Sequence, residues 1–149
     1  MRELKTISIS QDQDVVAARA ASRELAKSLG FGAADQTRLA TAVSELTRNI
    51  LRYAKKGECH IEDETDDLRA GIRVVVEDQG PGIPDLDRAM EDGFTTGGGL
   101  GAGLPGTKRL VHDFDIQSRP GHTKISIRMF SKKRAAAPKA LYAIAGRSR

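Results

Sequence analysis

The stretch KISIRM, residues 124–129, alternates strictly between polar and apolar side chains. Its apolar members, Ile125, Ile127 and Met129, fall at every second position, which is the spacing of one face of a β-strand. A strand with one apolar and one polar face is typical of an antiparallel sheet that packs on a core with one side and meets water with the other. We therefore expect a sheet with helices on one of its faces.

The neighbouring segments supply the other elements of this fold. Short alternating or β-branched runs predict strands at 4–9, 59–64, 72–76, 114–118 and 123–130. Apolar residues spaced by three and four predict helices at 12–29, closed by Gly30, and from about 36 to 55, with shorter helices at 85–91 and 104–111. Glu77 and Asp78, with the QGPGIP that follows, are expected to form a loop.

The order of these elements is β-α-α-β-β-α-α-β-β, with helices and strands grouped in blocks. Such grouping predicts an α+β fold rather than a doubly wound parallel sheet. We expect a two-layer α/β sandwich with a mixed, mostly antiparallel sheet and helices on one face.

Charge is distributed unevenly along the 149 residues, whose net charge is +4. Residues 131–149 carry six Lys and Arg and no acid, while residues 1–130 carry a small excess of acid. We expect one folded domain, 1–130, followed by a basic and mostly disordered tail, 131–149. The folded part has no basic footprint for nucleic acid, so no nucleic-acid partner is expected for it.

Cysteine content and hydropathy indicate the compartment. Cys59 is the single cysteine, which excludes an internal disulfide and fits a reducing environment. The start of the chain lacks the apolar run of a signal peptide, and no segment is apolar enough to span a membrane. A cytoplasmic protein without a membrane partner is expected. The three histidines, His60, His112 and His122, are scattered and are expected at the surface or in turns.

A glycine-rich stretch, TTGGGLGAGLPGTK at 95–108, has six glycines in fourteen positions. GAGLPG at 101–106 matches the dinucleotide pattern GxGxxG, but no apolar strand precedes it and no acid follows at the required distance. A P-loop is excluded because Thr107 and Lys108 stand in the wrong order. The stretch leads into a helix whose first N–H groups are free, which favours an anion, most commonly a phosphate. A surface loop without a ligand is the alternative.

Three polar residues have the chemistry of a phosphoryl-transfer site. Glu45 and Asn49 are one helical turn apart, and an amide oxygen suits Mg²⁺ while a carboxylate can accept a proton. Asp78 follows a buried strand and could accept the amino group of a nucleobase such as adenine. Gly80 and Gly82 would let that nucleobase approach the backbone. Taken singly, the first two would more often be a solvated pair and the third a turn cap.

In order, the motifs ExxxN, DxGxGI and GGGLGAGL resemble those of the GHKL ATPase/kinase superfamily, whose members share the Bergerat fold. The resemblance covers residues 4–130. Within the superfamily, four segments are similar in sequence to the RsbT-type switch kinases of the bacterial stressosome. They are DVVAAR, LGFGAADQTRLATAVSELTRNI, EDQGPGIPD and MEDGFTTGGGLGAGLPGTKRL.

The resemblance implies ATP and Mg²⁺ as cofactors and assigns roles to residues. Glu45 would be the catalytic base, Asn49 the Mg²⁺ ligand and Asp78 the acceptor for the adenine amino group. Thr123 would lie on the adenine side. The base pocket would be walled by Gly80, Gly82 and Ile83. The lid and phosphate-binding turn would comprise Gly97, Gly98, Gly99, Leu100, Gly101, Ala102, Gly103 and Leu104.

The resemblance also implies a function. A serine/threonine protein kinase would phosphorylate STAS-domain proteins of the stressosome-scaffold type and, once released, activate a PP2C-type phosphatase. The alternative is an anti-sigma factor that binds a sigma factor and has secondary kinase activity. A third possibility is nucleic-acid binding through the basic tail.

Overall fold

A computed structural model of the chain describes residues 2–83, 85–91 and 103–132. Most of the predicted lid, 97–102, and most of the predicted tail, 133–149, lie outside these described residues. The last strand continues to Lys132, so it includes the first two residues that were assigned to the tail.

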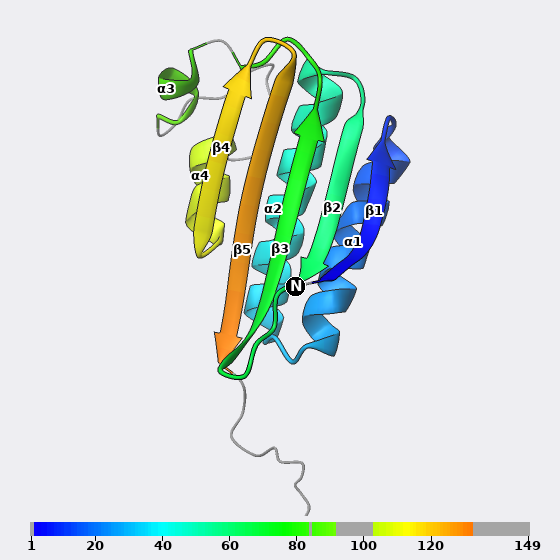
Figure 1. Cartoon of the computed structure of the whole chain (residues 1–149), viewed down its shortest axis with the longest axis vertical. Coiled ribbons are helices and arrows are strands. Elements are labelled where there is room, and N and C mark those ends of the chain that lie inside the picture. Colours follow the sequence, from blue (N-terminus) through cyan, green and yellow to red (C-terminus); the bar gives the residue numbers. More distant parts are fainter. Residues whose placement is uncertain (1, 84, 92–102, 133–149) are drawn as a thin grey trace, which may run out of the picture.

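The nine helices and strands of the described residues follow the predicted order (Figure 1). Their bounds are β1 Arg2–Ile9, α1 Asp12–Ser28, α2 Ala33–Tyr53, β2 Gly57–Asp63, β3 Arg69–Asp78, α3 Leu86–Ala89, α4 Gly103–Leu110, β4 Asp113–Arg119 and β5 His122–Lys132.

The strand β3 is longer than predicted. Glu77 and Asp78, expected in a loop, are its last residues and pair with Lys124 and Thr123 of β5. Their acidic side chains resemble loop composition, but the pairing with β5 supplies hydrogen bonds along the whole length of β3. The partner strand therefore overrides the local composition.

The strands form one sheet in the order β1-β2-β3-β5-β4. Every pairing in the described residues is antiparallel, so the prediction of a mostly antiparallel sheet is confirmed. The helices lie on one side of the sheet, which we call the covered face, and the opposite side is the open face (Figure 1). The predicted two-layer sandwich is confirmed.

The core lies between the covered face and α2. Val74 of β3 and Ile127 of β5 are buried, as are Leu39 and Leu46 of α2. Val74 belongs to the β-branched run, Ile127 to the period-two pattern, and the two leucines to the three-four pattern that predicted these elements. Burying one such side chain fully stabilises the fold by about 1.5–3 kcal/mol.

The end of α1 is set by a glycine. Gly30 has φ +86°, and its N–H donates to Lys27 O at 3.1 Å while the N–H of Phe31 donates to Ala26 O at 2.9 Å. This pair of bonds is a Schellman motif, in which glycine is favoured at the left-handed position. The motif turns the chain from α1 into α2, as the predicted closure at Gly30 implies.

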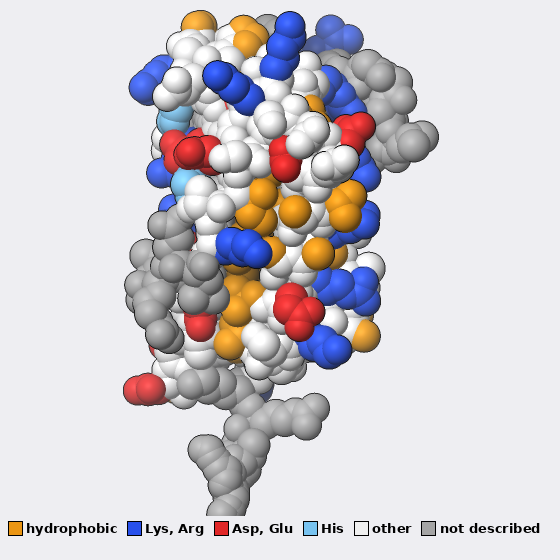
Figure 2. Space-filling view, turned by 90° about the vertical axis from the view of Figure 1, so that its right-hand side faces the viewer, with side chains coloured by type: hydrophobic (Ala, Val, Ile, Leu, Met, Phe, Trp, Pro, Cys, Tyr) orange, Lys and Arg blue, Asp and Glu red, His pale blue; other side chains and the backbone are white. Residues whose placement is uncertain are grey.

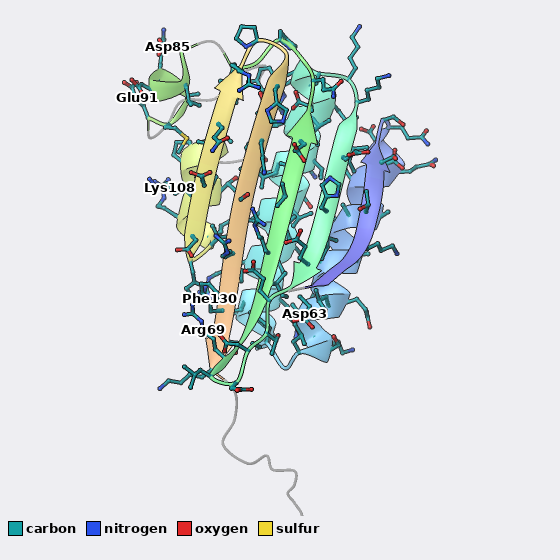
Figure 3. All side chains as sticks on the ribbon, viewed as in Figure 1. Asp63, Arg69, Asp85, Glu91, Lys108 and Phe130 are labelled. Atoms are coloured by element: carbon teal, nitrogen blue, oxygen red, sulfur yellow. The ribbon has the colours of Figure 1, made fainter. Side chains whose placement is uncertain are left out.

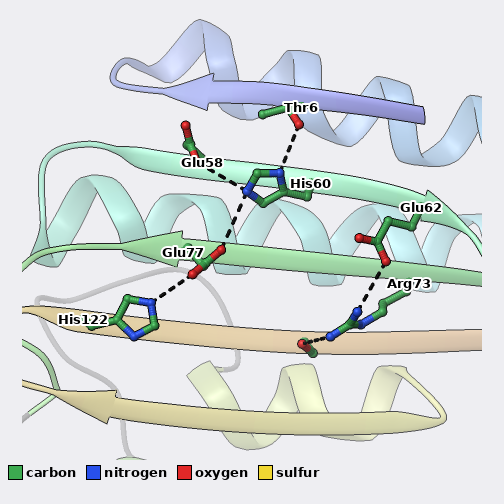
Figure 4. Close-up of polar contacts among 8 residues, drawn as sticks. Thr6, Glu58, His60, Glu62, Arg73, Glu77 and His122 are labelled. Atoms are coloured by element: carbon green, nitrogen blue, oxygen red, sulfur yellow. Dashed lines mark hydrogen bonds and ion pairs between the residues drawn. The ribbon is translucent and has the colours of Figure 1, made fainter. Parts of the chain in front are cut away.

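Hydrogen bonds and ion pairs cross the strands on the open face (Figure 4). His60 Nδ1 lies 3.0 Å from Thr6 Oγ1, and His60 Nε2 lies 3.4 Å from Glu58 Oε1 and 3.8 Å from Glu77 Oε1. His122 Nε2 lies 2.9 Å from Glu77 Oε2. Two of the three histidines, which the sequence placed as scattered surface residues, thus meet on one glutamate.

Part of the open face is buried, although the alternating pattern predicted that this face meets water. Ser126 of β5 is only 7% exposed and Val75 of β3 only 4%. Arg73 covers this region, because it lies 3.4 Å from Glu62 and donates to Ser126 Oγ at 3.3 Å. Long polar side chains can shield a sheet with their methylene stems.

The lateral surface that carries α1 and β1 is partly apolar. Figure 2 shows the side that carries α1 and β1, where hydrophobic side chains form a band between charged ones. A groove of about 260 Å³ there is lined in part by Ala21, Leu25 and Ile61.

At the C-terminal end of β5, the guanidinium carbon of Arg69 lies 3.5 Å from the ring centre of Phe130 (Figure 3).

Cys59 on β2 faces the core and has no exposed surface. Burial raises the pKa of its thiol to about 12. None of the described helices combines the length and apolar character needed to cross a bilayer.

Candidate functional site

Five of the predicted site residues meet around one small cavity between α2, β3 and β5. They are Asn49, Asp78, Gly82, Ile83 and Thr123. The rest of the lining is Leu46, Ile50, Tyr53, Val76 and Ile125. An apolar cleft with a few convergent polar groups is the usual form of a small-molecule site. The cavity holds about 10 Å³, which is room for one water, so a larger ligand must push its walls apart.

Asp78 is placed by the end of β3, directly opposite Thr123 of β5. Its Oδ1 accepts the backbone N–H of Gly80 at 2.9 Å, and no described residue donates to its Oδ2. Burial raises the pKa of this carboxyl, while the Gly80 bond and the charge of His122 act in the opposite direction. The site therefore offers one partly desolvated carboxylate oxygen to a hydrogen-bond donor.

The loop after β3 depends on its glycines. A Cβ at Gly80 would lie 2.6 Å from Ala54 Cβ at the end of α2. Gly82 has φ +86°, and a Cβ there would lie 2.7 Å from Arg119 O. The loop is also tied to the β4–β5 turn, because Gly121 N–H donates to Gly80 O at 2.8 Å. Glycine is thus required at both predicted positions, because neighbouring atoms leave no room for a Cβ.

A chain of three groups joins this loop to the two last strands. Ile83 N–H donates to Ser118 Oγ at 2.8 Å, and Ser118 Oγ lies 2.7 Å from Thr123 Oγ1. Ser118 was not predicted. Its register opposite Thr123 across the RPGH turn is a signal in the sequence that could have found it.

Glu45 and Asn49 lie one turn apart on α2, as predicted. Asn49 lines the cavity, whereas Glu45 is not among the lining residues and is 7% exposed. Asn49 Oδ1 accepts a long hydrogen bond of 3.3 Å from Arg52 Nη1. No hydrogen bond joins the Glu45 carboxylate to a described residue. The structure thus brings Asn49, but not Glu45, to the cavity that Asp78 lines.

Gly103 and Leu104 are the only residues of the predicted lid that the structure describes. Gly103 has φ +73° and begins α4, where its carbonyl accepts the Thr107 hydroxyl at 3.1 Å. Leu104 is buried in the core. The predicted residues Gly97, Gly98, Gly99, Leu100, Gly101 and Ala102 lie outside the described residues. Lys108 is exposed on α4 (Figure 3).

The donor set fits a shared magnesium better than a caged metal. No group of three or more His, Cys, Asp or Glu within residues 2–83, 85–91 and 103–132 could hold a metal ion. Magnesium, however, keeps several waters and takes one or two protein oxygens together with substrate phosphates. The Asn49 amide oxygen is of the required type, and its present partner is a displaceable arginine.

Comparison with known proteins gives a consistent result. Residues 34–133 match the family described as "Histidine kinase-, DNA gyrase B-, and HSP90-like ATPase". The chain is 52% identical over 121 residues to the serine/threonine-protein kinase RsbT of Bacillus subtilis (strain 168), which covers 81% of this chain and 91% of that protein.

Solved structures share the fold at low identity. The SiaB–SiaC complex of Pseudomonas aeruginosa contains a chain with a TM-score of 0.58 and 15% identity, covering 87% of this chain and 91% of that one. The RsbU and RsbW domains of Rv1364c from Mycobacterium tuberculosis give a TM-score of 0.57 and a sequence identity of 17% over 88% of this chain. Our chain spans only 34% of that Rv1364c chain.

Proposed function

We propose that the cavity between α2, β3 and β5 is an adenine pocket, because this chain belongs to the histidine kinase-, DNA gyrase B- and HSP90-like ATPase family and is a serine/threonine-protein kinase. The observation that carries this proposal is the placement of Asp78, which lies beside two obligatory glycines and keeps one carboxylate oxygen without a donor among the described residues.

Adenine would be held by the end of β3 and its neighbours. Asp78 would accept the exocyclic amino group, and Gly80, Gly82 and Ile83 would wall the ring. Thr123 lies directly across from Asp78 and completes the polar side of the pocket. Because the cavity holds only about 10 Å³, the ring must displace part of this wall to enter.

Asn49 would bind Mg²⁺ through its amide oxygen. That oxygen accepts a hydrogen bond from Arg52 at 3.3 Å, so Arg52 would have to release it for Asn49 to hold the metal. Bound MgATP supplies the phosphoryl group and the charge that stabilises its transfer. The Arg52 guanidinium would remain on the same helix, one turn from Asn49.

The predicted lid, Gly97 to Leu104, would contact the phosphates. Glycine has no Cβ, so the glycines would allow phosphates to approach the backbone N–H groups, and the start of α4 would add the positive end of a helix dipole. Gly103 and Leu104 are the residues of this segment that the structure describes.

Glu45 would act as general base. Its carboxylate would accept the proton of a serine or threonine hydroxyl of the protein substrate as that oxygen takes the phosphoryl group. Glu45 is buried on the same helix as Asn49 and has no described donor competing for its oxygens. This leaves it available as an acceptor once substrate reaches it.

The protein substrates would be STAS-domain proteins of the stressosome-scaffold type, and the released kinase would activate a PP2C-type phosphatase. The likeness to RsbT over most of both chains supports this partner-switching role. The alternative is an anti-sigma factor with secondary kinase activity.

The test is incubation of the purified chain with γ-labelled ATP, Mg²⁺ and a cognate STAS-domain protein. We expect phosphoserine or phosphothreonine on that protein. Glu45→Gln should slow transfer about 100-fold or more, since a general base contributes 10²–10⁴, while ATP affinity changes little. The control is Glu24→Gln, an exposed glutamate on α1, which should transfer at the normal rate.

Two results contradict the proposal. Transfer by Glu45→Gln at the normal rate removes Glu45 as the base. Co-purification with a sigma factor, in the absence of transfer to any STAS-domain protein, favours the anti-sigma alternative.

A further inference from the structure

We propose that Ser118 is a positioning residue that makes Thr123 a hydrogen-bond donor toward the base and thereby selects adenine over 6-oxopurines. This inference rests on the proposed adenine pocket and deepens it. Ser118 touches no ligand itself in this scheme. It acts through Thr123.

Three residues stand in a row across the sheet at the pocket. Asp78 of β3 pairs with Thr123 of β5, and Thr123 pairs with Ser118 of β4. Thr123 is buried and lines the cavity together with Asp78. The row therefore runs from the carboxylate, through the threonine hydroxyl, to the serine hydroxyl on the covered face.

The hydroxyl of Ser118 has one proton and two lone pairs to distribute. The N–H of Ile83 can only donate, so at 2.8 Å it occupies one lone pair of Ser118 Oγ. The second partner is Thr123 Oγ1 at 2.7 Å, where either oxygen could supply the proton. The direction of this second bond decides what Thr123 can offer to a ligand.

Only one direction satisfies Ser118. If Thr123 donated, Ser118 would accept twice and its own proton would need an acceptor, which no described residue other than Thr123 provides. If Ser118 donates to Thr123, its proton is used and the proton of Thr123 is left for the cavity. Ser118 is partly buried and Thr123 is buried, so in the empty pocket either direction leaves one hydroxyl proton without a described acceptor. A base that presents an acceptor to Thr123 uses both protons only if Ser118 donates to Thr123, so we assign Ser118 as the donor in the bound state.

The resulting pair of groups has a definite chemical preference. Asp78 presents an acceptor and Thr123, beside it, presents a donor. Adenine has the complementary edge, with an amino donor next to the ring acceptor N1. Guanine and hypoxanthine carry a carbonyl oxygen and an N1–H on that edge, so both of their groups meet groups of the same kind. Sites that leave polar groups unpaired in this way discriminate strongly.

The experiment compares ATP with 1-deaza-ATP, in which N1 is replaced by carbon, on the full chain by calorimetry. The wild type should bind ATP about 10-fold more tightly, the value of one hydrogen bond. Thr123→Val should bind both nucleotides equally. Ser118→Ala should reduce the preference below about 3-fold, because nothing then holds the Thr123 hydroxyl toward the base.

Two further variants separate this role from a structural one. Ser118→Thr keeps the hydroxyl and should restore the 10-fold preference. Ser126→Ala, which removes a buried hydroxyl bonded to Arg73 on the open face, should leave the preference unchanged. Since each ratio compares two ligands on one preparation, a loss of folded protein does not alter it.

The possible failures are distinct. A wild type that binds no ATP overturns the proposed function, and the inference with it. A wild type that binds ATP, with a Ser118→Ala variant that keeps the full preference for N1, overturns the inference alone. If the wild type binds ATP and 1-deaza-ATP with equal affinity, the inference is also overturned, because Thr123 then donates no hydrogen bond to N1.

Discussion

Glu77 and Asp78 are neighbours at the end of β3, yet their carboxylates lie on opposite faces of the sheet. Glu77 on the open face lies 2.9 Å from His122 and 3.8 Å from His60, and it remains in contact with solvent. Asp78 on the covered face has one backbone donor and a pKa raised by burial. The same chemical group is satisfied on one face and kept short of partners on the other. Period-two alternation places the two side chains on opposite faces, and the neighbours on each face then produce the difference.

The largest expected effect separates these two carboxylates directly. Asp78→Asn should weaken ATP binding about 100-fold, since a hydrogen bond to a charged group is lost and an amide donor faces the adenine amino group. The matched change, Glu77→Gln, should alter ATP binding by less than about 2-fold. Calorimetric titration with MgATP measures the affinity of each variant.

Equal affinities for the two variants would show that the face on which a carboxylate lies does not matter. Both substitutions keep the side-chain shape, and the amide oxygen introduced by Asp78→Asn can still accept the Gly80 N–H. Circular dichroism should therefore report an unchanged fold for each.

The backbone contacts that close the covered-face pocket give the next effect. Gly82→Ala should destabilise the protein by about 2–3 kcal/mol, because it adds a left-handed alanine and a collision with Arg119 O, which lies 2.7 Å from the new Cβ. Gly30→Ala has the same φ of +86° with nothing within 4 Å of the Cβ, and should cost only about 1 kcal/mol. Urea unfolding checks the difference, and equal losses would mean that close approach contributes nothing.

Two adjacent valines test the packing of the two faces. Val74 on the covered face is fully buried, so Val74→Ala should cost about 2 kcal/mol of unfolding free energy. Val75 on the open face is 4% exposed beneath polar side chains, which can relax into the space, so Val75→Ala should cost about 1 kcal/mol. A larger loss at Val75 than at Val74 in chemical denaturation would reverse our description of the core.

The smallest expected effect is the pH dependence that Asp78 contributes. Its folded pKa is raised above the ordinary value of 3.8, so the protonated form is favoured in the folded protein. The stability of the wild type relative to Asp78→Asn should therefore rise as pH falls through the raised pKa, and level off below 3.8. Unfolding curves of both proteins across this window measure the slope. A slope of the opposite sign would mean that the charged carboxylate is stabilised by folding.

Much of the fold followed from local patterns. The alternation at Ile125, Ile127 and Met129 identified the buried face of β5, and Gly30 marked the end of α1. Patterns of this kind report burial and backbone conformation, which neighbouring residues determine. The ends of β3 could not be found in this way, because Arg69 and Asp78 join the strand only through pairing with β5.

The site shows the same division. Asn49, Asp78 and Thr123 were predicted and do meet at one cavity. Ser118 was not predicted, although the RPGH turn places it opposite Thr123, and the Arg52 bond to Asn49 could not be predicted, because side-chain conformation decides it rather than residue type. The glycine-rich segment from 97 to 102 stays a prediction, since it lies outside the described residues.

Cys59, the single cysteine of the chain, is enclosed in the core with a thiol pKa of about 12. Alkylating reagents attack the thiolate, so a maleimide dye should not react with the native molecule and should label it only when the central strands separate. The labelling rate would therefore report how often β2 opens, without any engineered probe.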